Sequence, residues 1–140
     1  MTISDRNCKP YRVLYKKTSD LSVEEREQIY SIFDVNMRDF YTKSPWGLDE
    51  AQKRDEIFHA LTRFFIVYSD DNQIIAYADI RYESNDPDKP EFPVVYVYEF
   101  QIAPASQSIG LGIALLNVLK DFGARLEMKQ LVLTCFKSNR

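Results

Sequence analysis

The segment Val94–Leu119 combines side chains that could carry out acid–base chemistry with a turn that could bind an anion. Tyr96, Tyr98 and Glu99 lie close together in a predicted strand and can accept, donate or relay protons. A glycine-bearing turn and the start of a predicted helix follow at once. Backbone N–H groups and the positive end of a helix dipole meet at such a turn, which favours binding of phosphate or another anion. The segment therefore predicts an anion site beside a proton-handling cluster.

The turn has the sequence Gln107-Ser-Ile-Gly110-Leu-Gly112. It does not match the dinucleotide fingerprint G-x-G-x-x-G, because Leu115 occupies the third glycine position. It also lacks the G-x-x-x-x-G-K-[ST] spacing of a phosphate-binding P-loop. The pattern that remains is Q-x-x-G-x-G. The alternative interpretation is that the glycines only tighten a strand-to-helix turn.

The strand before this turn poses a geometric problem for shared chemistry. With a period of two, Tyr98 and Glu99 point to opposite faces of a regular strand, with Tyr96 and Phe100 on the first face and Gln101 on the second. Both groups could serve one amine only if a β-bulge distorts the strand there. The alternative is a strand whose aromatic side chains simply alternate across a sheet.

The elements that must position this segment are predicted from hydrophobic periodicity and turn residues. They are a strand at 11–17, a helix that ends before Pro45, a helix at Glu50–Leu61, strands at 63–68, 73–82 and 94–102, a helix from Gly112 to Leu126, and a strand at 130–136. Asp20 or Ser22 caps the first helix, and Ser22-Val-Glu-Glu25 fits a capping box. Residues 1–10 are expected to be a polar lead-in.

Short loops between the three middle strands favour an antiparallel meander. The fold class predicted for residues 1–140 is α/β of the α+β type, in a single domain. Its sheet is mixed but mostly antiparallel, is flanked by helices, and has the element order β-α-α-β-β-β-α-β.

Composition excludes several classes of function. A net charge of −3 gives no basic field for direct binding of nucleic acid, and no apolar run is long enough to span a membrane. Cys8 and Cys135 lack CxxC spacing, so free thiols are expected and no metal site is predicted. His59 is the only histidine, which limits histidine-based catalysis.

The Q-x-x-G-x-G turn after an antiparallel meander resembles the pyrophosphate loop of the GNAT N-acetyltransferase superfamily, whose motif is [RQ]-x-x-G-x-[GA]. In that family the loop holds the diphosphate of coenzyme A, so the resemblance implies acetyl-CoA as co-substrate. Strand N–H groups near residues 100–103 could polarise the thioester oxygen. The residues implied to bind the coenzyme are Gln101, Ile102, Ala103, Gln107, Ser108, Ile109, Gly110, Leu111, Gly112 and Asn139.

Three further segments resemble the NatD branch of the family: Tyr41 with Trp46-Gly47, Tyr96-Val-Tyr-Glu-Phe-Gln101, and Leu133-Thr-Cys-Phe-Lys-Ser-Asn139. Members of that branch acetylate the N-terminal α-amine of core histones that begin Ser-Gly-Arg-Gly. The resemblance implies that Glu99 and Tyr98 deprotonate the amine or relay its protons. It assigns the substrate peptide to Tyr41, Trp46, Tyr96 and Thr134, and to Glu83 or another acid of the loop 83–91.

The resemblance further implies a core-histone N-terminal peptide and the ribosome as partners, and the nucleus and cytoplasm as location. Two departures from the family pattern stand out. The final α-β-β of the family is expected to be absent after Arg140, which would expose a C-terminal edge suited to dimerisation. Gln107-Ser-Ile also replaces an arginine-rich loop, so weaker coenzyme binding is expected.

Two alternatives stay open. One is a GNAT enzyme that acts on a lysine side chain or a small-molecule amine. The other is a non-catalytic chain that binds the coenzyme or a partner.

Overall fold

The computed structural model describes residues 1–43, 47, 49–84, 93–125 and 130–133. Its strands form one six-stranded sheet in chain order, in which β6 is parallel to β5 and all other neighbours are antiparallel. The elements are β1 (Thr2–Ser4), β2 (Pro10–Lys17), the 3-10 turn η1 (Thr18–Asp20), α1 (Val23–Thr42), α2 (Glu50–Ile57), β3 (Arg63–Tyr68), β4 (Ile74–Ser84), β5 (Pro93–Ile102), the 3-10 turn η2 (Pro104–Ser106), α3 (Leu111–Arg125) and β6 (Gln130–Leu133).

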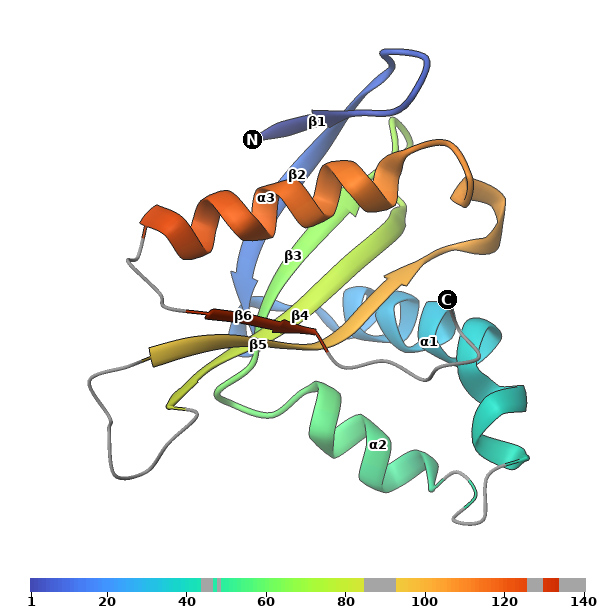
Figure 1. The fold of residues 1–140 in the computed structure, drawn as a ribbon. Coiled ribbons are helices and arrows are strands. Elements are labelled where there is room, and N and C mark those ends of the chain that lie inside the picture. Colours follow the sequence, from blue (N-terminus) through green and yellow to red (C-terminus); the bar gives the residue numbers. More distant parts are fainter. Residues whose placement is uncertain (44–46, 48, 85–92, 126–129, 134–140) are drawn as a thin grey trace.

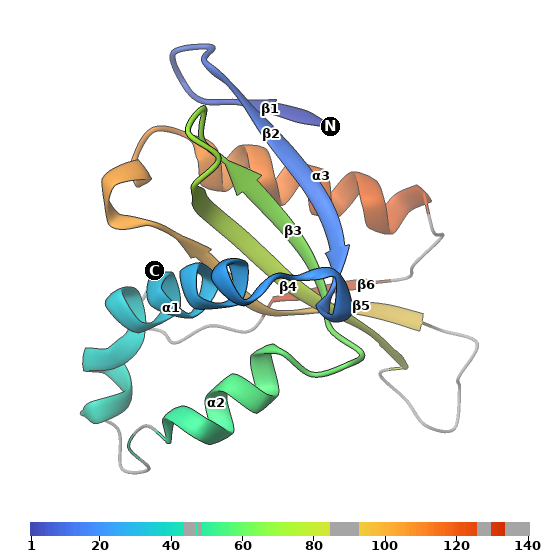
Figure 2. The same cartoon turned by 180° about the vertical axis from the view of Figure 1, so that it is seen from behind.

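The sheet separates two layers of helix. Helix α3 crosses one face, and α1 and α2 lie on the other (Figures 1 and 2). The predicted α+β architecture and the order of its elements are confirmed, with one short strand added in front.

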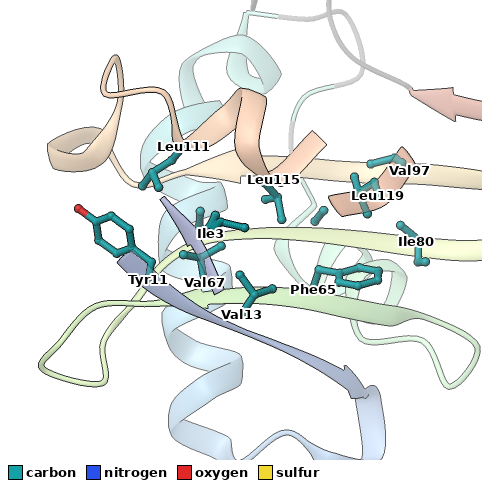
Figure 3. Packing of buried hydrophobic residues seen from close by; sticks show 12 residues of the cluster. Ile3, Tyr11, Val13, Phe65, Val67, Ile80, Val97, Leu111, Leu115 and Leu119 are labelled. Atoms are coloured by element: carbon teal, nitrogen blue, oxygen red, sulfur yellow. The ribbon is translucent and has the colours of Figure 1, made fainter. Parts of the chain in front are cut away.

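Helix α3 is held on its face of the sheet by a stripe of buried leucines. Leu111, Leu115 and Leu119 are fully buried against the sheet, where they meet Val67 and Val97 (Figure 3). Each buried leucine contributes about 1.5–3 kcal/mol relative to an exposed one. Because Leu111 is the first residue of α3, this packing fixes the helix N-terminus beside the end of β5.

Helix α1 covers the other face, and its N-terminus confirms the predicted capping box. The Ser22 hydroxyl accepts a hydrogen bond from the N–H of Glu25, and the Glu25 carboxylate accepts one from the N–H of Ser22. Of the two candidate caps, Ser22 is therefore the one used. Ile29, Phe33 and Met37 are buried at the predicted helical spacing.

Two predicted segments differ from the structure. The expected polar lead-in contains β1, because Ile3 is buried in the core and the strand pairs with β2. The helix predicted at Glu50–Leu61 ends at Ile57, and Leu61 is 64% exposed rather than part of an apolar face. The N–H of Phe58 closes the helix by donating to the carbonyl of Arg54.

The strand predicted at 73–82 is longer than expected. β4 extends to Ser84, so Glu83 lies in the strand and pairs with Val94 rather than lying in the following loop. The parts of the predicted last strand beyond Leu133 and the predicted helix end at Leu126 lie outside the described residues. Within the described part of the chain, no helix is long and apolar enough to cross a membrane.

Candidate active site

A β-bulge in β5 lies at the centre of the site. Asp79 pairs with Glu99, but the next residue of β4, Ile80, pairs with Val97, so Tyr98 is an extra residue in β5. The ring of Tyr98 lies 4.7 Å from the guanidinium carbon of Arg81. The bulge therefore falls at the position where a regular strand would separate the two predicted proton-handling groups.

The bulge places Tyr98 and Glu99 on the side of the sheet that faces α2. Arg81, which lies over Tyr98, donates a hydrogen bond to the carbonyl of Glu56 in α2, and Glu99 forms an ion pair with Lys53 of the same helix. Tyr96 also lies on this side, with its ring 6.0 Å from that of Tyr98.

Phe100 instead packs against the core under α3. The simple alternation grouped Tyr96 with Tyr98 correctly. It was wrong in placing Phe100 with them and Glu99 opposite, because the extra residue resets the pattern after Tyr98. The distortion needed for Tyr98 and Glu99 to serve one amine is present. Their catalytic roles remain predictions.

Asp79 stabilises this distortion and was missed by the sequence analysis. Its Oδ1 accepts the backbone N–H of Glu99 at 2.8 Å, while its Oδ2 has no hydrogen-bond partner although the side chain is buried. Burial, reinforced by the nearby charge of Glu99, raises the pKa of Asp79 well above its usual value. The carboxyl group of Asp79 is therefore harder to ionise than that of an exposed aspartate. A single acid inside the apolar strand 73–82 was the available signal.

Lys53 fills the space in front of Glu99. Its ammonium contacts Glu99 Oε1 and lies 4.9 Å from the ring centroid of Phe33 and 5.4 Å from that of Tyr41. Burial lowers the pKa of Lys53, but attraction to Glu99 and hydrogen bonds with Glu99 and Tyr41 outweigh it and raise the pKa above the ordinary range. Sequence alone does not single out Lys53, since a helix of eight residues with many charges gives no sign of which one is buried.

Three amide side chains hold Glu99 and the end of β5 in place. Asn36 of α1 donates from Nδ2 to Gln101 Oε1 at 3.1 Å and to the carbonyl of Ile102 at 2.8 Å. Gln101 donates in turn to Glu99 Oε2 at 3.2 Å, and Gln107 donates to the carbonyl of Ile102 at 2.9 Å. The side chains of Gln101 and Gln107 are therefore engaged within the protein.

The far edge of β5 offers backbone groups to a ligand. In the described residues, β6 pairs only with residues 94–97 of β5. The N–H of Ala103 donates to the carbonyl of Ile75 in β4 at 2.8 Å, so it cannot polarise a thioester. Because antiparallel pairing alternates, the backbone groups of Phe100 and Ile102 point away from β4, towards this edge. Of the predicted residues 101–103, Ile102 is the one that presents its N–H there.

The turn after β5 forms a cradle of backbone groups. Ser108 and Gly110 have φ angles of 65° and 91°, in the left-handed region that favours glycine. A Cβ at Gly112 would lie 3.2 Å from Cδ1 of Ile102, so this turn packs directly on the strand. The first N–H groups of α3, which begins at Leu111, have no carbonyl partner within the helix. This geometry fits a diphosphate.

The backbone of Arg6 lies against the turn, so its guanidinium is the nearby charge that could reach an anion bound there. Arg6 lies in the β1–β2 connection, and its N–H donates to the carbonyl of Ile109 at 2.6 Å. A Cβ at Gly110 would lie 3.2 Å from the same nitrogen. The exposed Arg6 guanidinium has no ion pair within the described part of the chain. Arg6 could not be identified from the sequence, because β1 was not predicted.

The remaining predicted residues are placed only in part. Tyr41 and Tyr96 line the side of the sheet that carries Glu99. Trp46, Thr134 and Asn139 lie outside the described residues, and for Glu83 only the backbone is described. Among the side chains that are described, no group of three or more His, Cys, Asp or Glu could hold a metal ion.

Comparison with known proteins gives a consistent picture. The model of the acetyltransferase (GNAT) family matches residues 27–140. A predicted acetyltransferase from Clostridium acetobutylicum, solved with acetyl-CoA, is similar with a TM-score of 0.65 and 20% identity over 92% of this chain and 84% of that chain.

Two other solved structures share the fold. One is a ribosomal-protein-alanine N-acetyltransferase from Brucella melitensis biovar Abortus, with a TM-score of 0.64 and 10% identity over 91% of this chain and 81% of that chain. The other is an aminoglycoside acetyltransferase from an uncultured soil metagenomic sample, with a TM-score of 0.65 and 15% identity over 91% of this chain and 79% of that chain.

Proposed function

Because the chain belongs to the acetyltransferase (GNAT) family and is an N-acetyltransferase, we propose that its acceptor is the α-amine of a protein N-terminus of the Ser-Gly-Arg-Gly type, as in core histones. The bulge at Tyr98 is the observation that carries this proposal. The bulge brings the Glu99 carboxylate and the Tyr98 phenol to the same side of the sheet, where the Lys53 ammonium already pairs with Glu99. The Y-x-Y-E-x-Q segment that contains it is also the most specific part of the resemblance to the NatD branch.

Glu99 is the proposed general base. An α-ammonium group must lose a proton before its nitrogen can attack an acyl carbon, and a positioned carboxylate can accept that proton. Gln101 and the backbone contact with Asp79 fix the carboxylate, and its side chain is only 9% exposed. A group in this role contributes about 100- to 10,000-fold to the rate. Tyr98, which is 38% exposed, lies at the solvent side of Glu99 and is suited to relay the proton outward.

Acetyl-CoA, the co-substrate of this family, supplies a thioester-activated acetyl group. The turn around Gly110 and the start of α3 would hold its diphosphate, with Arg6 beside them. The N–H groups of Phe100 and Ile102, on the stretch of β5 that β6 does not pair with in the described residues, would orient the rest of the molecule. The charge of Arg6 would partly replace the arginines that the family's loop carries and that Gln107-Ser-Ile lacks.

The acceptor peptide is proposed to contact Tyr41 and Tyr96, together with Trp46, Thr134 and Glu83. If the acceptor is a histone N-terminus, we expect this protein in the nucleus and the cytoplasm. We also expect it to meet newly made chains at the ribosome. Dimerisation through the C-terminal edge stays a prediction, to be checked by sedimentation.

The test compares acceptors. Wild-type protein and Glu99→Gln are incubated with acetyl-CoA and one of three acceptors: a Ser-Gly-Arg-Gly peptide, an N-blocked lysine peptide, or an aminoglycoside. We expect the first peptide to be acetylated, with turnover by Glu99→Gln lower by about 100-fold or more and coenzyme affinity unchanged.

Acetylation of the lysine peptide or the aminoglycoside alone would replace the proposed acceptor with that amine. Acetyl-CoA binding without turnover on any acceptor would instead favour the non-catalytic alternative.

A further inference from the structure

The space in front of Glu99 has the construction of a binding site for an ammonium ion. Lys53 brings its ammonium group from α2 to the Glu99 carboxylate, beside the adjoining rings of Phe33 and Tyr41. Carboxylates and aromatic faces together are the groups that select a cation in proteins. The side chains of Lys53 and Glu99 are 13% and 9% exposed, so this contact is shielded from solvent, unlike an ordinary surface ion pair.

The groups behind this cage are fixed independently of Lys53. Gln101 holds the second oxygen of Glu99, and Asn36 holds Gln101. Asp79 holds the backbone of Glu99. The cage is therefore a preorganised part of the sheet and α1, and Lys53 enters it from a separate element.

Lys53 also has a second carboxylate within reach. Glu56, one turn further along α2, lies 3.7 Å from the Lys53 ammonium and is 55% exposed. Helix α2 is itself attached to α1, because Arg54 pairs with Glu27 at 2.8 Å and stacks on Tyr30 at 4.0 Å. A change of partner from Glu99 to Glu56 would thus need only a side-chain rotation, with α2 staying in place.

We propose that Lys53 is an internal occupant of the acceptor-ammonium subsite formed by Glu99, Phe33 and Tyr41, and that the acceptor amine binds by displacing it towards Glu56. The proposal rests on the proposed function for the identity of the acceptor, but not for the existence of the subsite. Its ligand class is a primary ammonium group on a narrow, unbranched stem, the shape that the lysine side chain itself presents. Because Lys53 retains its proton beside Glu99, it competes for the subsite as a cation and does not act as the nucleophile.

The subsite can be tested without any acetyl transfer. Lys53→Ala empties the cage, and n-propylammonium chloride is the probe that replaces the missing side chain. The melting temperature of Lys53→Ala should rise with this probe relative to sodium chloride at equal ionic strength. Wild-type protein and the matched control Lys17→Ala, which removes an exposed lysine, should show no such difference.

Combining Lys53→Ala with Glu99→Gln should abolish the response to the probe. A folded Lys53→Ala variant that responds no more than Lys17→Ala would overturn the proposal. Lys53→Met preserves the length and apolar contacts of the side chain, so it keeps the proposal testable if the alanine variant does not fold.

Kinetics supply the second arm. Removing the internal competitor in Lys53→Met should lower KM for the Ser-Gly-Arg-Gly peptide about tenfold, since a competitor that occupies the site nine-tenths of the time reduces apparent affinity by that factor. Glu56→Gln removes the alternative partner and should raise the same KM. If Lys53 is purely structural, KM should stay unchanged or shift in the same direction in both variants. That result would refute displacement. If no variant acetylates any peptide, the proposed function fails, while the response to propylammonium still decides the subsite.

Discussion

Replacing Gly110 with alanine tests whether the turn after β5 is the strained cradle that the structure shows. Gly110 has a φ angle of 91°, and a Cβ there would lie 3.2 Å from the backbone nitrogen of Arg6. An L-residue in the left-handed region costs about 1–2 kcal/mol. The contact with Arg6 adds to this cost, because a backbone atom cannot rotate away as a side chain can. We expect Gly110→Ala to lose about 2 kcal/mol of unfolding free energy.

Gly123→Ala is the matched control. Gly123 lies inside α3, and a Cβ there would meet no atom of the described residues within 4 Å. Alanine is favoured over glycine in a helix interior by about 0.5–1 kcal/mol, so this variant should be slightly more stable than the wild type. The two variants add the same methyl group and are expected to change stability in opposite directions.

Two measurements check the prediction. Urea unfolding should show a midpoint about 1 M lower for Gly110→Ala, given typical slopes of about 1–3 kcal/mol per M. Calorimetric titration with coenzyme A should show affinity lower by about tenfold or more for Gly110→Ala and unchanged for Gly123→Ala. Equal stability and equal coenzyme affinity in the two variants would refute both the strain and the cradle. A stability loss with unchanged affinity would refute the cradle alone.

Three further predictions follow from charged groups. Burial raises the pKa of Glu25, but hydrogen bonds from Lys16, Tyr68 and the Ser22 backbone outweigh it and lower the pKa from 4.5 to about 2. The contribution of Glu25 to stability is therefore full above pH 4.5 and is lost as pH falls towards 2. Glu25→Gln should therefore cost up to about 3 kcal/mol at pH 7 and nothing near pH 2, as measured by urea unfolding across that range. The effect of Asp79 on stability has the opposite sign. Its pKa is raised on folding, so wild-type stability should fall as pH rises above 3.8, and Asp79→Asn should reduce that slope in urea unfolding. Arg6→Gln should weaken coenzyme A binding about fivefold, as expected for an exposed ion pair worth about 1 kcal/mol, and equal affinity at both low and high salt would refute the role of Arg6.

The parts of this fold that sequence could predict are those determined by local patterns. The capping box at Ser22 and Glu25 depends on residues three positions apart, and the buried stripe of α3 depends on a repeat along one helix. β1 was missed because a three-residue strand with one buried side chain, Ile3, carries too few alternations to stand out. The end of α2 was misplaced for a related reason, since Leu61 continues the helical spacing but has no surface to pack on.

The candidate site was predictable only to the extent that its residues are contiguous. Tyr98 and Glu99 were identified from one strand, but whether they cooperate depends on a bulge, and that bulge is supported by Asp79 from the neighbouring strand. Lys53 and Arg6 reach the site from elements whose own sequences give no sign of it. Each acts through a contact between segments distant in the chain, which a pattern along one segment cannot encode. These same contacts decide the chemistry, because the charge next to Glu99 and the cation next to the glycine turn determine which ligands the two halves of the site can accept.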